Sequence, residues 1–271
     1  MAKPWEIDEE LWFQVETLLP VHRPGTRGPI PLDDRKCLQG ILFVFYTGIN
    51  WKHLPPELGF GSGITCWRRF RRWCEAGVWD RLHRFLLSEL HALGEINWST
   101  VCVDGSHVRA KKRDEGTGPS PVDRGRPGTK HHIACDSAGI PLAIITTAGN
   151  VPDIKAAQDL VEAIPPVAGR VARPRRRPEV ILADGGYDSQ AFRDWLRSKR
   201  IEPIIPQRGR KKIIGLGTIR WVVEQSIAHF HQFKRLAIRW DRHLLMHEGF
   251  TKLAAALICW RRLARAHNAR S

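Results

Sequence analysis

The sequence predicts a mixed α/β protein in which a small all-α region precedes a domain that contains a β-sheet. Before Trp98, apolar residues recur with the 3.6-residue period of amphipathic helices. After Trp98 they form short runs bounded by turn residues, which is the pattern of buried strands. We therefore expect two domains, a helical one over residues 1–97 and an α/β one over residues 98–271.

In the first domain, capping and breaking residues delimit the periodic segments. Asp33 and Ser62 are suitable N-caps, and Gly48 stands where a helix C-cap glycine is expected. The expected helices are 8–19, 34–46, 64–74 and 79–93. The second and third of them have the order of a helix-turn-helix unit, an arrangement that places its later helix on DNA.

In the second domain, apolar runs alternate with helical segments. The expected strands are 100–104, 131–136, 142–147, 179–184 and 203–205, and the expected helices are 154–164, 189–198, 218–236 and 247–265. Segments 111–129 and 170–178, rich in Gly, Pro and charge, are expected to be loops. A run of three strands followed by a helix–strand alternation and a final helix fits a ribonuclease H-like core, and other three-layer folds also fit it.

The charge of the chain points to a polyanionic partner. Its formal net charge is +15, and the excess of Lys and Arg is concentrated after residue 200. Such a field favours a phosphate backbone, because Lys and Arg displace the counterions condensed on it. The chain shows neither an apolar run of the ~20 residues that span a bilayer nor a signal peptide. We expect a cytoplasmic, nucleoid-associated protein with no membrane partner.

The six cysteines include no Cys-x-x-Cys pair and are expected to be reduced and buried. His131 and His132 lie near Cys135 and Asp136, and together these four residues include the side-chain types that bind zinc. Alternation along a strand, however, points the two histidines to opposite faces of the sheet. Neither a zinc site nor a disulfide framework is expected.

Two aspartates each follow a buried apolar run and precede a glycine, namely Asp104 and Asp184. An ionised Asp at such a position is costly unless it is paired or binds a cation. If their strands are neighbours, the two carboxylates lie side by side, and Mg²⁺ would relieve their repulsion. Each Asp-Gly taken alone also fits a plain turn after a strand.

Glu224 lies in the expected helix 218–236. At about 100° per residue it shares a polar stripe with Arg220, His231 and Arg235, beside an apolar face. An Arg/Glu pair four residues apart is also common on solvated helices. Asp104, Asp184 and Glu224 are together the candidate catalytic and metal-binding set.

Basic residues supply the candidate DNA contacts. In helix 64–74, Arg68, Arg69, Arg71 and Arg72 alternate with aromatic residues, so this helix is expected to read DNA, although an amphipathic helix with solvated arginines has the same pattern. Contacts to the DNA backbone are expected from residues elsewhere, with solvated surface charge as the alternative. These residues are Arg109, Lys130, Lys211, Lys212, Arg220 and Arg235.

Motifs spread over nearly the whole chain carry a family resemblance. They are the residues 34–35, 48–56, 68–73, 103–106, 125–130, 183–188 and 220–225, which include Val103-Asp104-Gly105-Ser106, Ala183-Asp184-Gly185-Gly186-Tyr187-Asp188 and Arg220-Trp221-Val222-Val223-Glu224-Gln225. Together they resemble the DDE transposases of bacterial insertion sequences, in the group called insertion sequence family five. The resemblance implies that Asp104, Asp184 and Glu224 are the catalytic triad, accompanied by Arg220.

The resemblance also implies an activity. A transposase of this kind would bind the terminal inverted repeats of its element and catalyse DNA cleavage and strand transfer with two Mg²⁺ ions, for which Mn²⁺ can substitute. Its partner would be double-stranded DNA of the element ends and the target, with self-association on DNA. An endonuclease that does not join DNA and a DNA-binding repressor derived from an inactive transposase remain alternatives. Gly217 and His231 depart from the family, which often has Tyr and Lys there.

Overall fold

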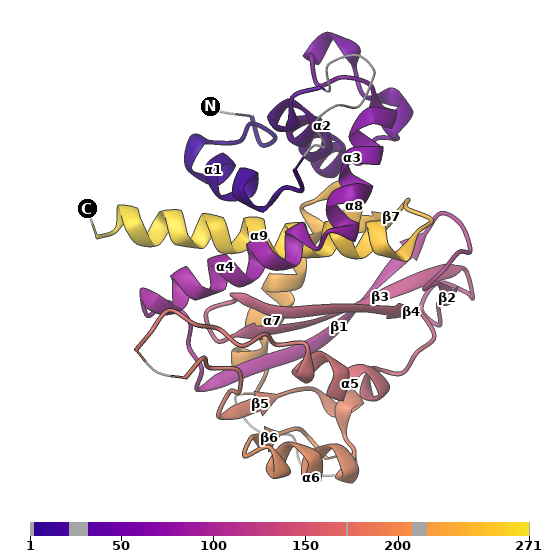
Figure 1. Cartoon of the computed structure of the whole chain (residues 1–271). Coiled ribbons are helices and arrows are strands. Elements are labelled where there is room, and N and C mark those ends of the chain that lie inside the picture. The colour runs from indigo at the N-terminus through magenta and orange to yellow at the C-terminus, as the bar shows by residue number, and fades with distance from the viewer. Residues whose placement is uncertain (1–2, 22–31, 172, 208–215, 271) are drawn as a thin grey trace.

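The computed structural model describes residues 3–21, 32–171, 173–207 and 216–270, with the backbone alone at 216–220. Helices from both ends of the chain form a layer above a mixed sheet, and further helices cover the sheet on its other sides (Figure 1). The mixed α/β class and the helical N-terminal region are confirmed. None of the helices within these ranges is long and apolar enough to cross a bilayer.

The N-terminal helices begin and end close to where the sequence predicts. They are α1 (Glu9–Leu18), α2 (Asp34–Thr47), α3 (Gly63–Glu75) and α4 (Val78–Ala92), with short 3-10 turns η1 (Trp51–His53) and η2 (Pro56–Leu58) between α2 and α3. Asp33 caps α2 by accepting from Lys36 N, and Ser62 caps α3 by accepting from Thr65 N. Gly48 ends α2 with φ +72°, the left-handed conformation that favours glycine.

The sheet has the strand order of a ribonuclease H-like core. Strands β1 (Thr100–Ala110), β3 (Pro127–Asp136) and β4 (Pro141–Ala148) form an antiparallel meander. Strand β5 (Val180–Leu182) pairs in parallel with β1, and β6 (Glu202–Ile204) in parallel with β5. The central order is therefore β4-β3-β1-β5-β6, with the two-residue strands β2 (Gly118–Pro119) on β3 and β7 (Ile238–Arg239) on β1.

The remaining helices pack on the sheet. They are α5 (Asp153–Glu162), η3 (Gly185–Tyr187), α6 (Gln190–Ser198), α7 (Leu216–His231), α8 (Lys234–Ala237) and α9 (Leu244–Asn268). Helix α5 contacts β3 and β4, whereas α7 contacts β1 and β3 and α9 contacts β4. His132 of β3 faces the start of α5 and His131 faces α9, so these helices lie on opposite faces of the sheet.

Helix α9 joins the two halves of the chain, because it packs along α4 and also contacts α3, α7 and β4. Phe45 of α2 stacks on Phe233 and on Phe250 of α9, with ring centroids 4.4 and 5.0 Å apart. Phe70 of α3 stacks on the same Phe250 at 4.2 Å. The apolar core is continuous across the expected boundary at residue 97, and the division into two domains stays a prediction.

Two expected elements differ from the structure. Segment 111–129 is not one loop, because β1 continues to Ala110, β2 follows, and β3 begins at Pro127. These extensions are paired in the long β1–β3 ladder. Residues 105–107 of β1 are half-buried and do not form the apolar run by which buried strands are recognised in a sequence. The expected helix 218–236 breaks after His231, and the short α8 begins at Lys234 after an extended Phe233.

Candidate active site

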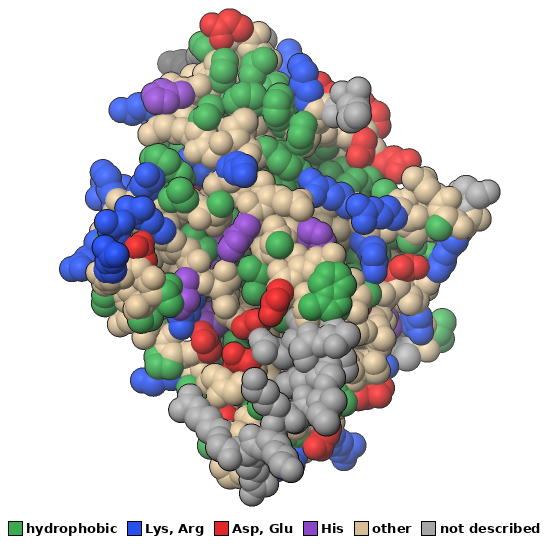
Figure 2. Space-filling model, turned by 180° about the vertical axis from the view of Figure 1, so that it is seen from behind, with side chains coloured by type: hydrophobic (Ala, Val, Ile, Leu, Met, Phe, Trp, Pro, Cys, Tyr) green, Lys and Arg blue, Asp and Glu red, His purple; other side chains and the backbone are tan. Residues whose placement is uncertain are grey.

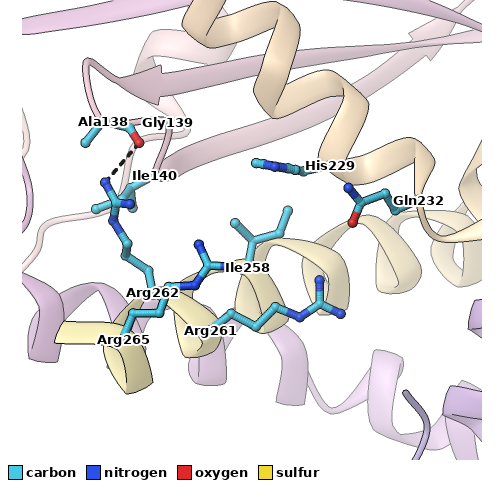
Figure 3. A pocket seen from close by; sticks show the side chains of 9 residues that line it. All are labelled: Ala138, Gly139, Ile140, His229, Gln232, Ile258, Arg261, Arg262 and Arg265. Carbon is cyan, nitrogen blue, oxygen red and sulfur yellow. Dashed lines mark hydrogen bonds between the residues drawn. The ribbon is translucent and has the colours of Figure 1, made fainter. Parts of the chain in front are cut away.

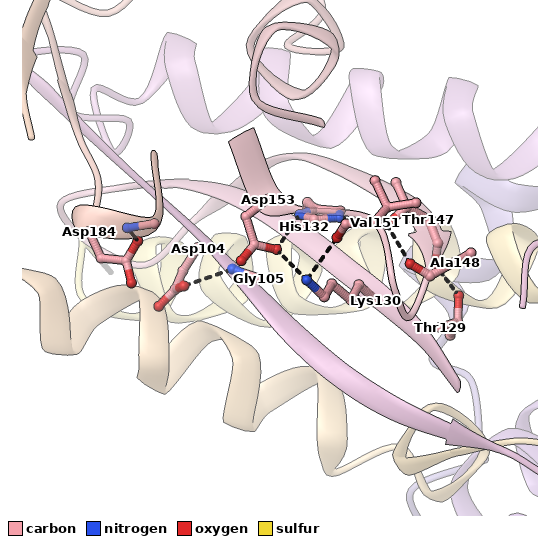
Figure 4. Close-up of polar contacts among 11 residues, drawn as sticks. Asp104, Gly105, Thr129, Lys130, His132, Thr147, Ala148, Val151, Asp153 and Asp184 are labelled. Atoms are coloured by element: carbon pink, nitrogen blue, oxygen red, sulfur yellow. Dashed lines mark hydrogen bonds and ion pairs between the residues drawn. The ribbon is translucent and has the colours of Figure 1, made fainter. Parts of the chain in front are cut away.

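Asp104 and Asp184 are neighbours at one edge of the sheet. The parallel register that pairs Cys102 with Leu182 leads, two residues further along each chain, to these two aspartates. Figure 4 shows the carboxyl groups of Asp104 and Asp184 close to each other. The neighbouring strands on which the two-aspartate prediction depended are thereby confirmed, although Asp104 lies within β1 and does not end it.

Backbone N–H groups orient both carboxylates. Gly105 N donates to Asp104 Oδ1 at 2.7 Å, and Gly186 N donates to Asp184 Oδ1 at 2.8 Å. Asp184 thus serves as the N-cap of η3, and both side chains are half-buried. Each aspartate therefore holds one oxygen toward its own backbone and is restricted in rotation.

Glu224 stands on the exposed side of α7. It shares this side with Trp221, Gln225 and Ala228, while Val223 is buried against the core. On the buried side of α7, Ser226 Oγ donates to Gly139 O at 3.2 Å. This hydrogen bond connects α7 to the turn between β3 and β4. The backbone of Arg220 lies one turn before Glu224, and its side chain lies outside the described part of the structure.

The donors at this edge suit a hard cation, because carboxylate oxygens are the ligands that Mg²⁺ prefers. Within the described ranges, no group of three or more His, Cys, Asp or Glu side chains is arranged to hold a metal ion. Mg²⁺ in phosphoryl-transfer sites is usually held by one or two carboxylates together with substrate phosphates and water. The pair Asp104 and Asp184, drawn in Figure 4, fits that arrangement. Among the described residues, Glu224 does not form a three-ligand group with this pair.

A third carboxylate, which the sequence did not reveal, stands beside Gly105, on the face of β1 opposite to the Asp104 side chain. Asp153 begins α5, and its Oδ1 accepts from Lys130 Nζ at 2.9 Å (Figure 4). Lys130 Nζ also donates to Val151 O at 2.8 Å, and its side chain is only 7% exposed. The ammonium group of Lys130 points into the protein toward Asp153, so the structure gives no support to the predicted DNA contact by Lys130.

Gly105 makes room for this ion pair. A Cβ atom at Gly105 would lie 2.9 Å from Asp153 Oδ1 and 3.3 Å from His132 Nδ1. His132 is fully buried, and its Nε2 lies 2.8 Å from Thr147 Oγ1. Burial lowers the pKa of His132 to about 4, so its ring is neutral near pH 7. His132 therefore adds no charge to the face of β1 on which Gly105 lies, and the ion pair between Lys130 and Asp153 supplies the charges there.

The four arginines of α3 divide into two pairs. Arg68 and Arg71 are exposed, and Arg71 pairs with Glu75 at 2.9 Å. Arg69 forms an ion pair with Asp34, and Arg72 donates to Val21 O at 2.9 Å. Only the first pair is placed on the surface where a DNA groove can be contacted.

Arg235 is turned inward and does not lie on the Glu224 stripe, because α7 ends before it. It makes two hydrogen bonds to the carboxylate of Asp241, at 3.0 and 2.8 Å, and its side chain is 3% exposed. The structure therefore gives no support to the predicted DNA contact by Arg235. Arg109 is exposed, as a backbone contact requires, whereas Lys211 and Lys212 lie outside the described residues.

Charge is unevenly distributed on the face seen in Figure 2. Acidic side chains gather near its centre, and Lys and Arg side chains gather at both sides of them. Opposite charges so arranged would let a polyanion contact the flanks while the acids in the middle hold a cation.

Comparisons with known proteins agree with the motifs. Residues 99–259 match the family described as Transposase DDE domain, and residues 7–83 match a candidate transposase family described as IS4/5. The chain is 49% identical over 150 residues to a candidate transposase for insertion sequence element IS402 of Burkholderia cepacia, covering 55% of this chain and 71% of the relative.

A second relative belongs to the same element. It is an uncharacterised 16.2 kDa protein of IS402 in Burkholderia cepacia, 49% identical over 124 residues, which cover 45% of this chain and 84% of the relative. Among solved structures, a chain of a pre-cleavage Mos1 transpososome aligns over 94% of this chain and 86% of its own length. Its sequence identity is 14% and its TM-score is 0.27.

Proposed function

The chain belongs to the Transposase DDE domain family, and from this premise we propose that it binds the terminal inverted repeats of an insertion sequence and catalyses their Mg²⁺-dependent cleavage and transfer. The single observation that carries the proposal is the adjacency of Asp104 and Asp184 at the sheet edge. Two carboxylates brought together on neighbouring strands repel each other unless a cation lies between them.

The residues have distinct proposed roles. Asp104 and Asp184, oriented by the N–H groups of Gly105 and Gly186, would hold Mg²⁺, which supplies charge neutralisation for in-line displacement at phosphorus. Glu224 would complete the set from the exposed side of α7 once DNA lies along that helix. Arg220, on the same helix, would hold a phosphate with its guanidinium fork.

The helical region would select the DNA. Arg68 and Arg71 are on the free surface of α3, and Trp73 of the same helix is buried in the core. That arrangement suits a helix that lies in the major groove with its arginines at guanine edges and phosphates. Both ends of an element must be cut together, so we expect self-association on DNA, in the bacterial cytoplasm.

The test incubates the full chain with Mg²⁺, a duplex that carries one end of the element, and a target plasmid. We expect nicking at the element end followed by joining, both abolished by a chelator and restored by Mg²⁺ or Mn²⁺. Asp104→Asn, Asp184→Asn and Glu224→Gln should each lower the cleavage rate at least about 100-fold while DNA binding remains. Asp194→Asn, on the exposed surface of α6, is the matched control.

Each other outcome has a definite meaning. Joining that survives Asp184→Asn contradicts the site assignment. Cleavage without joining supports an endonuclease that does not transfer strands. Binding without cleavage by the unaltered protein supports a DNA-binding repressor.

A further inference from the structure

A basic cavity lies between α7, α9 and the turn that joins β3 to β4, and Figure 3 shows the side chains that line it. Its volume is about 160 Å³. Three arginines of α9, Arg261, Arg262 and Arg265, line it together with His229 and Gln232 from the end of α7. None of the residues that line this cavity is acidic, so the positive charge inside it is not neutralised by its own wall.

The arginines are not equally engaged. Arg261 donates to the hydroxyl of Tyr46 at 2.6 Å and lies over the ring of Phe233, so it is held by the core. Arg262 donates through Nη2 to Ala138 O at 3.2 Å, but its Nε is buried without a hydrogen-bond partner. The guanidinium of Arg265 is exposed, and within the described residues it has neither a hydrogen bond nor an ion pair.

A buried N–H without an acceptor is costly, and an oxyanion in the cavity would satisfy it. His229 is suited to the same ligand as a neutral donor, because burial and the neighbouring Arg261 and Arg265 lower its pKa. The amide of Gln232 adds a further donor at the rim. Asp136, behind the β3–β4 turn, offsets part of the charge of Arg262, but no carboxylate stands in the wall to compete for Arg265. Charged and neutral donors in such a wall are the chemistry of a phosphate site.

The position of the cavity indicates whose phosphate it takes. His229 follows Glu224 by five residues on the same helix, an axial rise of about 7.5 Å. Five residues also turn the helix by about 140°, so His229 and Glu224 lie at opposite edges of the exposed side of α7, which leaves the cavity open to DNA on that side. We propose that this cavity binds one backbone phosphate of the element-end DNA strand that lies along α7. The inference rests on the proposed function of Glu224 at the cleaved phosphate.

The test measures binding of the full chain to a mixed-sequence duplex of about 30 base pairs as a function of salt, because each phosphate contact changes the slope of log K against log salt by about 0.9. Arg262→Gln/Arg265→Gln should reduce that slope by about 0.9, the value for one lost phosphate contact, and Arg265→Gln alone by no more than this, with affinity at physiological salt lowered about tenfold. Lys252→Gln removes one charge from the same helix at its Asp80 ion pair, outside the cavity, and should leave the slope unchanged.

A second probe locates the phosphate. Element-end duplexes that carry a single neutral methylphosphonate should lose affinity for the unaltered protein at one position near the cleavage site, and Arg265→Gln should be insensitive there. Arg265 makes no internal bond in the described structure, so this variant keeps the test valid if Arg262→Gln disturbs folding, which a thermal melt checks.

Equal changes in slope for Arg265→Gln and Lys252→Gln, or no change for either, would overturn the proposal. So would thermal stabilisation by sodium phosphate that depends on Arg265 while DNA binding does not, since the cavity would then take the free ion. The binding assays require no catalysis. If the unaltered protein fails to cleave but the methylphosphonate effect is present, the proposed function fails and the phosphate site stands.

Discussion

His131 Nε2 lies 2.8 Å from His247 Nε2, and the two buried rings stack with centroids 5.0 Å apart. One ring must donate its Nε2 proton and the other must accept it, so the pair cannot persist when both imidazoles are protonated. Burial accordingly lowers the pKa of His131 to about 3 and that of His247 well below its usual value. The pair joins β3 to α9 on the face of the sheet opposite α5.

This pair should make the fold sensitive to acid. Both histidines bind protons more readily in the unfolded chain, where the pKa of a histidine is near 6.5. The stability that the neutral pair contributes is therefore fully present above pH 6.5 and is lost as the pH falls toward 3. Each such histidine lowers the free energy of unfolding by about 1.4 kcal/mol per pH unit in this window. Urea unfolding from pH 7 to pH 4.5 measures the slope, which His131→Gln should flatten. The exposed His53→Gln is the control, and an equal slope in all three proteins would contradict the prediction.

Substitutions of Lys130 and Asp153, which form an ion pair, should have coupled effects on the free energy of unfolding. Lys130→Met leaves the Asp153 carboxylate beside buried His132 and should lower the free energy of unfolding by about 2 kcal/mol. Lys130→Met/Asp153→Asn should be less destabilised than the sum of the single variants, because neither charge is then left alone. Chemical denaturation of the four proteins gives the interaction energy. Additive single effects would show that the two groups act independently.

Arg235 should affect stability and not DNA binding. Arg235→Lys loses one of the two parallel hydrogen bonds to Asp241 as well as the guanidinium that lies over Trp51. We expect a loss of about 2 to 3 kcal/mol in the free energy of unfolding. The salt dependence of DNA binding by the folded variant should match that of the unaltered protein. A change in its slope would mean that Arg235 meets a phosphate after all.

Arg68 and Arg71 should affect DNA preference and not stability. Arg68→Ala and Arg71→Ala should reduce the preference for terminal-repeat DNA over scrambled DNA, by about 1 to 3 kcal/mol for each lost contact to a base. Their melting temperatures should change little, since both side chains are exposed. Arg69→Ala, which removes the ion pair with Asp34, should show the opposite pattern. Competition binding and thermal melts on the three variants make the comparison.

Local signals in the sequence were sufficient for the helix ends and for the aspartate pair. Asp33, Ser62 and Gly48 act on neighbouring residues, so their capping could be predicted without knowledge of the fold. The adjacency of Asp104 and Asp184 followed from the strand order alone, because parallel neighbours end at the same edge. Alternation along β3 likewise predicted that His131 and His132 face opposite ways, and their partners confirm it.

Contacts between distant segments could not be predicted from local pattern. Lys130 and Arg235 look like surface cations until Asp153 and Asp241 are brought against them. Asp153 itself has no motif around it that marks a charged group beside Gly105 and Lys130. Whether a cation faces solvent or a buried carboxylate is decided by tertiary packing, which the charge pattern does not encode.

The contact of α9 with α3 and α4 also determines when, during synthesis, the N-terminal helices gain their full apolar support. Phe250 is made long after Phe45 and Phe70, the residues that it covers. At synthesis rates of about 5 to 20 residues per second, Phe250 is synthesised roughly ten seconds or more after Phe70 of α3. A chain truncated before α9 would therefore lack the aromatic ring that covers Phe45 and Phe70, and its N-terminal helices would expose that apolar surface to water.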